Sequence, residues 1–304
     1  MKKFIIKICF FFICIIFIDF LFGWICSYLN SHAKGGDTKS HYYISNQSTE
    51  DIVILGSSRA IHHYIPSILS DSLNLSVYNG GVDGNGIIFL YGRLKIITNR
   101  HTPKIVIYDA NTDFDIKVND NSKYLNWLKR FYDKPGIDSL FLCISHTDKY
   151  KMRSNLYRYN TSFIQMTSDN ISPKQIVKNG GYKPIYGEMN YDSSYLGLDS
   201  SSTIDWDPIK YHYFIKLIEL CHKKNITLII STSPMYKATS SDCFSPIKDL
   251  CIKYNIPFID FYANNEISIT KKYFKDSSHM NHDGATIFSS LVASKIKTIL
   301  DDNN

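Results

Sequence analysis

Short apolar runs alternate with amphipathic helical repeats along most of this chain. The runs at 52–55, 104–109 and 226–230 are continuous and rich in β-branched residues, which is typical of strands buried on both faces of a sheet. Two shorter runs, at 75–78 and 257–260, are expected as further strands. Strands that alternate with helices in this way form a mostly parallel sheet with right-handed crossovers. The pattern therefore predicts an α/β fold with helices covering both faces of the sheet.

The helices are expected between these strands. A helical stretch follows the first strand to about residue 71. Asp207 and Pro208 indicate the start of another helix, because a capping Asp and a Pro in the first turn favour helix initiation. Further helices are expected at 245–254 and from about Asp283 onward. Their apolar stripes recur at helical spacing and comprise Ile87, Leu90, Tyr91, Leu94 and Ile97, then Phe214, Leu217, Ile218 and Cys221, and finally Ala285, Phe288, Val292, Ile296 and Ile299.

Two stretches depart from the alternation. Residues 115–206 are rich in Tyr, Asn, Ser and Lys, and they contain a loop-like tract at 172–203. We interpret them as an insertion between the third and fourth strands, too poor in buried strands to form a domain of their own. Residues 31–50 are polar and rich in Gly, Ser, Asn and His, which predicts a linker. The expected organisation is a membrane segment at 1–30, a linker at 31–50 and one domain at 51–304.

The N-terminal segment is long and apolar enough to cross a membrane. Residues 8–29 would reach about 33 Å as a helix, whereas the apolar part of a cleavable signal peptide has about 7–15 residues. Trp24 and Tyr28 lie at the depth of an interface, and Lys2 and Lys3 precede the run. The positive-inside rule then places the bulk of the chain outside the cytoplasm. We expect a retained single-pass anchor in the cell membrane with the main domain in the periplasm.

Two features of this segment leave alternatives open. Ser31-His32-Ala33 offers a small-x-small motif, so cleavage after Ala33 is the alternative to a retained anchor. Asp19 lies inside the apolar run. Its carboxyl group is expected either to be protonated or to face a partner helix.

Composition excludes several classes of protein. Hydrophobic residues make up 44% of the chain and charged residues 20%, which builds a packed core and argues against disorder. The formal net charge of +6 is modest for 304 residues, and there is no basic run with interleaved aromatic residues, so no nucleic-acid partner is expected.

The cysteines do not indicate a metal site. Four of the seven, Cys143, Cys221, Cys243 and Cys251, lie beyond the apolar segment without CxxC or CxxH spacing, so zinc is disfavoured and no metal or cofactor is expected. Cys243 and Cys251 are the nearest couple for a disulfide. Buried free thiols are the alternative.

Candidate chemistry gathers where strands are expected to end. The first strand leads into Gly56-Ser57-Ser58-Arg59, the second into a glycine-rich turn at 79–86, and the third into 109–113. Asp276 and His279 follow the last strand directly before the terminal helix. In open α/β sheets ligands bind at the carboxyl ends of the strands, and Asp-x-x-His spacing lets a carboxylate orient an imidazole toward a serine.

Together these motifs resemble the SGNH/GDSL hydrolase superfamily of esterases, lipases and acyl-ester transferases, over roughly residues 51–300. The resemblance implies a flavodoxin-like three-layer α/β/α sandwich with a central parallel sheet, and close similarity to membrane-anchored members from gut Bacteroidetes. It assigns Ser58 as the nucleophile, with Ser57 in place of the more usual aspartate. Asp276 and His279 match the family's Asp-x-x-His block.

The resemblance also implies an oxyanion hole. The family's oxyanion glycine falls on Gly84, and its asparagine falls on Asn111, although that block departs from Gly-x-Asn-Asp at Ala110 and Thr112. The backbone N–H of Ser58 is the third expected donor. Arg59 is a candidate contact for an anionic substrate group, or a partner for Asp83 or Asp113.

The motifs indicate an active site only when they occur together, because each of them alone has an ordinary structural explanation. A glycine-rich turn is often only a turn, and Asp-x-x-His before a helix can be a cap beside a surface imidazole. The expected function is a serine esterase that removes O-acyl groups, with acetyl as the leading expectation, from a carbohydrate or envelope polymer through a Ser-His-Asp triad. The alternatives are an O-acyltransferase that acts on a glycan beside a membrane acyl-donor protein, and a non-catalytic glycan-binding or scaffold protein.

Overall fold

A computed structural model describes the chain except for residues 120, 143–144, 146, 191–204, 264 and 303–304. Its centre is a sheet of parallel strands: β1 (Ile52–Gly56), β2 (Val77–Asn79), β3 (Ile105–Asp109), β4 (Thr227–Thr232) and β5 (Phe258–Asp260). Their order is β2-β1-β3-β4-β5, the flavodoxin-like order. The predicted α/β fold with a parallel sheet is confirmed, and β1 lies between β2 and β3.

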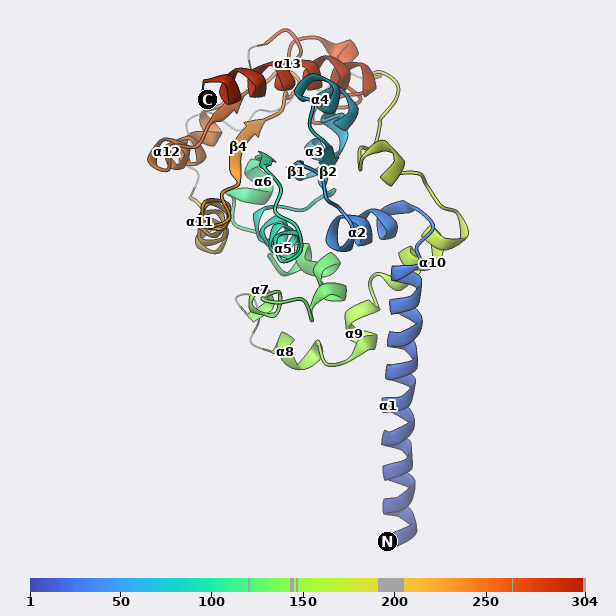
Figure 1. Ribbon diagram of the computed structural model, residues 1–304. Helices are drawn as coiled ribbons and strands as arrows, with labels where there is room; N and C mark the ends of the chain where they lie inside the picture. Colours follow the sequence, from blue (N-terminus) through green and yellow to red (C-terminus); the bar gives the residue numbers. More distant parts are fainter. Residues whose placement is uncertain (120, 143–144, 146, 191–204, 264, 303–304) are drawn as a thin grey trace.

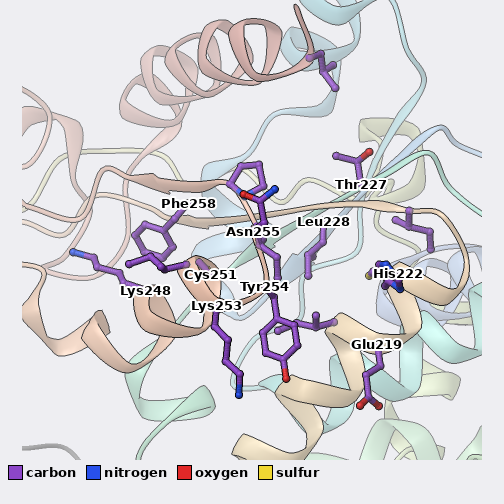
Figure 2. Close-up of a pocket in the computed structure, with 17 residues that line it drawn as sticks. Glu219, His222, Thr227, Leu228, Lys248, Cys251, Lys253, Tyr254, Asn255 and Phe258 are labelled. Atoms are coloured by element: carbon purple, nitrogen blue, oxygen red, sulfur yellow. The ribbon is translucent and has the colours of Figure 1, made fainter. Parts of the chain in front are cut away.

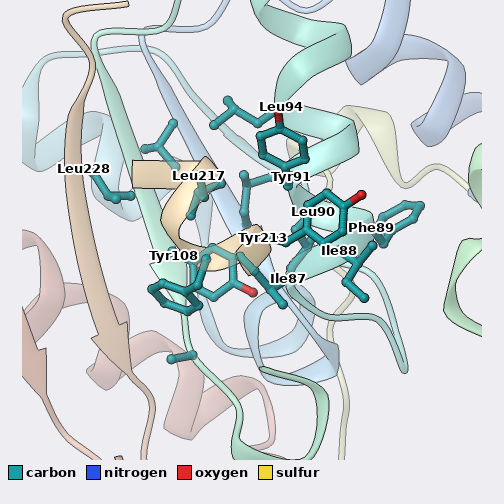
Figure 3. Close-up of a cluster of buried hydrophobic side chains, with 14 of the residues drawn as sticks. Ile87, Ile88, Phe89, Leu90, Tyr91, Leu94, Tyr108, Tyr213, Leu217 and Leu228 are labelled. Carbon is teal, nitrogen blue, oxygen red and sulfur yellow. The ribbon is translucent and has the colours of Figure 1, made fainter. Parts of the chain in front are cut away.

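Side chains of the strands alternate between two cores. In β1, Ile52 and Ile54 pack toward α3 (Ser58–His63), α4 (Pro66–Leu73) and α13 (His282–Asp301). Val53 and Leu55 point to the other face, toward α5 (Ile87–Thr98) and α11 (Pro208–Lys223). Figure 3 shows this second core, where side chains of α5 and α11 meet those of β3 and β4. Burial on both faces explains why the strands read as continuous apolar runs.

Local sequence explains several element boundaries. Asp207 caps α11 by accepting hydrogen bonds from the backbone N–H groups of Ile209 and Lys210, and Asn281 caps α13 in the same way. The helix expected after β1 is two helices, because Pro66 starts α4 and its ring is incompatible with the interior of a continuing helix. A further helix, α12 (Ser245–Lys253), precedes β5.

The structure differs from the expected linker at 31–50. Residues Gly36–Asn46 form a helix, α2, that packs against the main domain. Ile44 is fully buried in the core, and the ring of His41 stacks on Trp127 with centroids 4.1 Å apart. The polar composition was misleading because this helix buries polar as well as apolar side chains, Thr38, His41 and Ser45 among them.

The described part of the insertion consists of short helices joined by turns and loops. After α6 (Thr112–Asp115) it contains a 3-10 helix, η1 (Asn121–Phe131), then α7 (Asp138–Leu142), α8 (Asp148–Lys151), α9 (Asn155–Tyr159), α10 (Phe163–Ile171) and η2 (Val177–Asn179). Two 3-10 turns, η3 (Asp242–Phe244) and η4 (Lys271–Tyr273), lie outside the insertion. Within the described residues of the insertion no strand is present.

The first helix, α1 (Lys2–Ser31), is long and apolar enough to cross a membrane. Its first half projects away from the rest of the molecule, while its second half lies beside α9 and α10 (Figure 1). A separate small core joins these helices and comprises Cys26, Tyr159 and Met166 with Phe22, Leu29 and Phe163 around it. Cys243 and Cys251 are both free thiols, whereas Cys143 lies outside the described residues.

Candidate active site

The turn after β1 presents a serine at the start of a short helix. Ser57 is the N-cap of α3 and Ser58 its first residue, so the backbone N–H of Ser58 is one of those that have no partner within the helix. Gly56 has a φ of 155°, and a Cβ there would lie 2.6 Å from the Cβ of Ala60. The close approach of α3 to the strand end therefore requires glycine at this position.

Ser58, His279 and Asp276 form one chain of hydrogen bonds. The Oγ of Ser58 lies 2.8 Å from Nε2 of His279, and Nδ1 of His279 lies 3.0 Å from both carboxylate oxygens of Asp276. If Nδ1 carries the ring proton and donates a hydrogen bond to Asp276, Nε2 is free to accept a hydrogen bond from the serine hydroxyl. This is the geometry that a serine nucleophile with a general base requires.

The Asp276 carboxylate is held by its own turn. Its Oδ1 accepts hydrogen bonds from the backbone N–H groups of Ser278 at 2.8 Å and His279 at 2.9 Å. Partial burial acts to raise the pKa of Asp276, but the hydrogen bond and charge of His279 and these N–H groups outweigh it and lower the pKa below 3.8. The carboxylate is therefore ionised at neutral pH.

His63 supports the loop that carries His279. Its Nε2 accepts a hydrogen bond from the backbone N–H of Met280 at 2.9 Å, so this nitrogen is unprotonated. Burial, together with the nearby charges of His279 and Arg59, lowers the pKa of His63 well below 6.5. A neutral, fully buried imidazole therefore fixes the residue that follows His279.

His62 connects the site to the glycine-rich turn. Its Nε2 lies 3.0 Å from Oδ1 of Asp83 and its Nδ1 lies 2.7 Å from the carbonyl oxygen of Lys183. Its ring meets that of His279 edge to face, with centroids 5.7 Å apart. Asp83 also pairs with the Lys183 ammonium at 3.4 Å. This network holds the residue immediately before Gly84.

The glycine-rich turn is also fastened to α3. Nδ2 of Asn79 donates to the carbonyl oxygens of Ala60 and Tyr64, and its Oδ1 accepts from the N–H of Gly81. Gly84 has a φ of 65°, and a Cβ there would meet no atom within 4 Å. Gly84 therefore faces open space on the side where a side chain would lie.

Asn111 reaches the serine turn from the end of β3. Its Nδ2 donates to Oγ of Ser57 at 3.2 Å, and its Oδ1 accepts from the N–H of Asp113 as the cap of α6. Ala110 and Thr112, where this block departs from the family pattern, do not displace the Asn111 amide, which lies beside Ser57.

Arg59 points into the protein. The residue is only 3% exposed. Its guanidinium donates a hydrogen bond to the carbonyl oxygen of Ala110 at 2.6 Å and lies over the ring of Tyr262. The alternative partners have other contacts, since Asp83 pairs with His62 and Lys183, and Asp113 pairs with Lys117. Arg59 therefore connects α3 to the residue that follows β3.

Two buried carboxylates beneath these turns, Asp109 and Asp115, were not predicted from the sequence. Asp109 accepts hydrogen bonds from the hydroxyl of Tyr64 and from the N–H and hydroxyl of Ser233, and burial raises its pKa. Asp115 accepts from the backbone N–H groups of Asn111 and Ile87. The only available signal was the set of acidic residues that follows β3, which does not distinguish buried from exposed carboxylates.

A groove lies away from this site. It has a volume of about 1300 Å³ and lies between α11 and α12, where Glu219, His222, Lys253 and Tyr254 line it (Figure 2). It also touches Thr227 at the start of β4, so it opens at the amino ends of the strands. Ligands of such sheets bind at the opposite, carboxyl ends. Among the described residues no cluster of three or more metal-ligating side chains occurs.

Comparisons with known proteins find likeness only at the level of structure. No family model and no curated protein matches the chain. A GDSL-like lipase from Bacteroides thetaiotaomicron is 12% identical with a TM-score of 0.40, covering 91% of this chain and 98% of its own. An acetyl xylan esterase is 14% identical with a TM-score of 0.38, covering 82% and 98%.

A family two carbohydrate esterase from Clostridium thermocellum is 10% identical with a TM-score of 0.42, and the match covers 84% of this chain and 66% of that one. These neighbours carry the GDSL and esterase names of the superfamily that the sequence motifs resemble. Because every one of these TM-scores is below 0.5, the function proposed below rests on the geometry of this chain's own residues.

Proposed function

We propose that this protein is a serine ester hydrolase of the SGNH/GDSL type. The observation that carries the proposal is the hydrogen-bonded chain from Ser58 Oγ through His279 to Asp276, with separations of 2.8 and 3.0 Å. It lies at the carboxyl edge of a parallel sheet, where such folds bind their ligands. A hydroxyl, an imidazole and a carboxylate aligned in this order are what a serine nucleophile with an oriented general base requires.

The proposed reaction is acyl transfer through a covalent intermediate. His279 Nε2 takes the proton of Ser58 as Oγ attacks the ester carbonyl carbon, and it returns that proton to the departing alcohol. Asp276 orients the ring and stabilises the imidazolium. The N–H groups of Ser58 and Gly84 and the Asn111 amide are the proposed donors to the oxyanion. Water, activated by His279 in the same way, then releases the acid.

The proposed substrate is an O-acylated carbohydrate or envelope polymer, with acetyl esters first. The support is the expected export of the domain, together with an exposed aromatic ring beside His282. Tyr186 is 68% exposed, and its centroid lies 5.5 Å from that of His282, three residues after His279. An exposed aromatic ring of this kind suits the apolar face of a sugar. Release of acetate from acetylated xylo-oligosaccharides tests this assignment. We expect Tyr186→Ala to lose this activity but to keep its hydrolysis of a small ester.

The proposed location is the outer face of the cell membrane, with α1 as a retained anchor. Its length, its apolar composition and the lysines that precede it support this. Carbonate-washed membranes should retain the protein, and protease should reach the domain from the extracytoplasmic side only. A soluble form that begins at Lys34 would show cleavage instead.

Labelling with a fluorophosphonate probe tests the activity directly. Full-length protein in detergent should react, and Ser58→Ala should not, whereas Ser278→Ala serves as a matched control in the neighbouring turn. The same proteins are assayed for hydrolysis of 4-nitrophenyl acetate. Labelling that persists in Ser58→Ala and disappears in Ser57→Ala would move the nucleophile by one residue. Full activity with both serines replaced would contradict the proposal.

A further inference from the structure

Asp19 in α1 has its partners at the start of α9. One carboxylate oxygen accepts hydrogen bonds from the hydroxyl of Ser154 at 2.7 Å and the N–H of Leu156 at 2.9 Å. The other accepts from the N–H and side-chain amide of Asn155 at 2.9 and 3.2 Å. Of the two explanations that the sequence left open, the structure favours contact with a partner helix.

The contact continues along the second half of α1. A Cβ on Gly23 would lie 2.3 Å from Cγ of Asn155, so glycine permits α9 to approach closely. Further on, Nδ2 of Asn170 in α10 donates to the carbonyl oxygen of Leu29 at 3.1 Å. In Figure 1 α9 and α10 accordingly lie beside α1, and α8 lies at the level of α9. The insertion is thus attached to the apolar helix from Asp19 onward.

The position of Asp19 along α1 sets the depth of this contact in a bilayer. Exposed Trp24 and Tyr28 are the aromatic residues that favour the outer interface, and Asp19 lies five residues before Trp24, about 7.5 Å deeper. The apolar residues 8–18, which precede Asp19, reach only about 16 Å as a helix, less than a hydrocarbon core of about 30 Å. The start of α9 therefore falls within the hydrocarbon of the outer leaflet.

The surface of this part of the insertion suits such a position. Leu156 and Ile164 are exposed apolar side chains, and Tyr150 is 60% exposed. The ammonium of Lys149 and the guanidinium of Arg153 lie over the Tyr150 ring, 4.9 and 5.7 Å from its centroid. Lys and Arg side chains can reach from an apolar layer to the anionic headgroups, which attract their charges.

We propose that residues 148–164 form a membrane seat, a part of the globular domain inserted into the outer leaflet of an anionic bilayer. The inference rests on the membrane anchor of the proposed function and goes beyond it, because a simple anchor needs only α1. Four hydrogen bonds satisfy the Asp19 carboxylate, which lowers the cost of placing it at this depth. The seat holds the domain in one orientation against the membrane.

Photolabelling from the acyl chains tests the seat. Full-length protein is reconstituted in vesicles of phosphatidylethanolamine and phosphatidylglycerol that contain a lipid with a diazirine near the middle of its chain, and labelled peptides are mapped by mass spectrometry. We expect label on α1 and on the peptides with Tyr150, Leu156 and Ile164. Ile252 and Ile269 are matched controls, since they are 80% and 67% exposed on other parts of the domain, and they should stay unlabelled.

The outcomes separate the seat from the anchor. Label on α1 without label on 148–164 would overturn the seat and leave the anchor, whereas an unlabelled α1 would overturn both. Equal label on Ile252 would also overturn the seat. In Asp19→Leu the label on 148–164 should fall severalfold and trypsin should cleave faster after Arg153, while α1 remains labelled. Asp71→Leu, at an exposed site on α4, is the control, and unchanged labelling in Asp19→Leu would overturn the role of Asp19.

Discussion

Asp115 holds Asn111 in place: its Oδ2 accepts the backbone N–H of Asn111 at 2.7 Å. Its other oxygen accepts the N–H of Ile87 and the hydroxyl of Tyr108. One buried carboxylate therefore fixes both the turn that carries Asn111 and the helix that follows Gly84. The Asn111 side-chain amide and the Gly84 backbone N–H, both proposed as donors to the oxyanion, therefore depend on the same carboxylate.

Replacing Asp115 should disturb the oxyanion donors without touching the triad. In Asp115→Asn the amide must present an NH₂ group to at least one of the donors, which leaves a buried donor unsatisfied at a cost of about 1–3 kcal/mol. We expect kcat on 4-nitrophenyl acetate to fall more than KM rises, while fluorophosphonate still labels Ser58. Asp113→Asn is the matched control, because Asp113 is exposed in the same turn. An unchanged kcat in Asp115→Asn would contradict this support.

Asp115 also predicts a pH dependence of stability. Burial is the main cause that raises its pKa, from 3.8 to about 6. The folded state therefore binds the Asp115 proton more tightly than the unfolded chain does. The contribution of this proton to the free energy of unfolding is complete below about pH 4 and is lost as the pH rises through 6. The unfolding free energy of the wild type should lose on the order of 3 kcal/mol over this window relative to Asp115→Asn. Urea unfolding at several pH values measures it, and a constant difference between the two proteins would refute it.

Ser58 and His279 should act as one unit. Ser58→Ala and His279→Ala are each expected to lose most of the kcat, and the double variant should lose little more, because either change removes the same proton transfer. Asp276→Asn should leave more residual rate, since other groups partly orient the imidazole. His222→Ala, on the exposed part of α11, is the control. Independent, additive losses in the double variant would contradict a shared mechanism.

Asn111 has two roles that one substitution can separate. Asn111→Ser keeps an oxygen that can cap α6 but removes the Nδ2 donor. We expect kcat to fall on the order of 10²-fold, with thermal stability close to that of the wild type. Asn111→Ala should lose a similar factor in kcat and also about 1 kcal/mol of stability from the lost cap. Equal kcat in Asn111→Ser and the wild type would remove Asn111 from the oxyanion hole.

Two glycines of the site should respond differently to alanine. In Gly56→Ala the new Cβ would lie 2.6 Å from Ala60 Cβ and 2.8 Å from the carbonyl oxygen of Asp109, which should cost about 1–3 kcal/mol or more. Gly84→Ala meets no atom and bears only the left-handed φ of 65°, a cost of about 1–2 kcal/mol. Thermal unfolding compares them, and a smaller loss in Gly56→Ala would contradict the close packing at the serine turn.

The sequence predicted what depends on local pattern. Continuous β-branched runs indicated the strands, and Asp276 and His279 were recognisable because three residues suffice to bring their side chains together. The inward direction of Arg59 was not predictable, because it depends on Ala110, which is 51 positions away. The role of Asp115 and the helix α2 were missed for a different reason, because both depend on burial of polar groups, which hydrophobic periodicity does not register.

The hydrogen bonds of Asp19 also impose a sequence of events during synthesis. Its partners Ser154 and Leu156 come 135 and 137 residues later in the chain, an interval of about 7–27 s at 5–20 residues per second. In the anchored protein that we propose, α1 leaves the translocation channel for the lipid well before those partners emerge. The nascent chain therefore holds an unpaired carboxyl group in the membrane until α9 arrives, and export must deliver residues 154–156 to the bilayer surface before the molecule is complete.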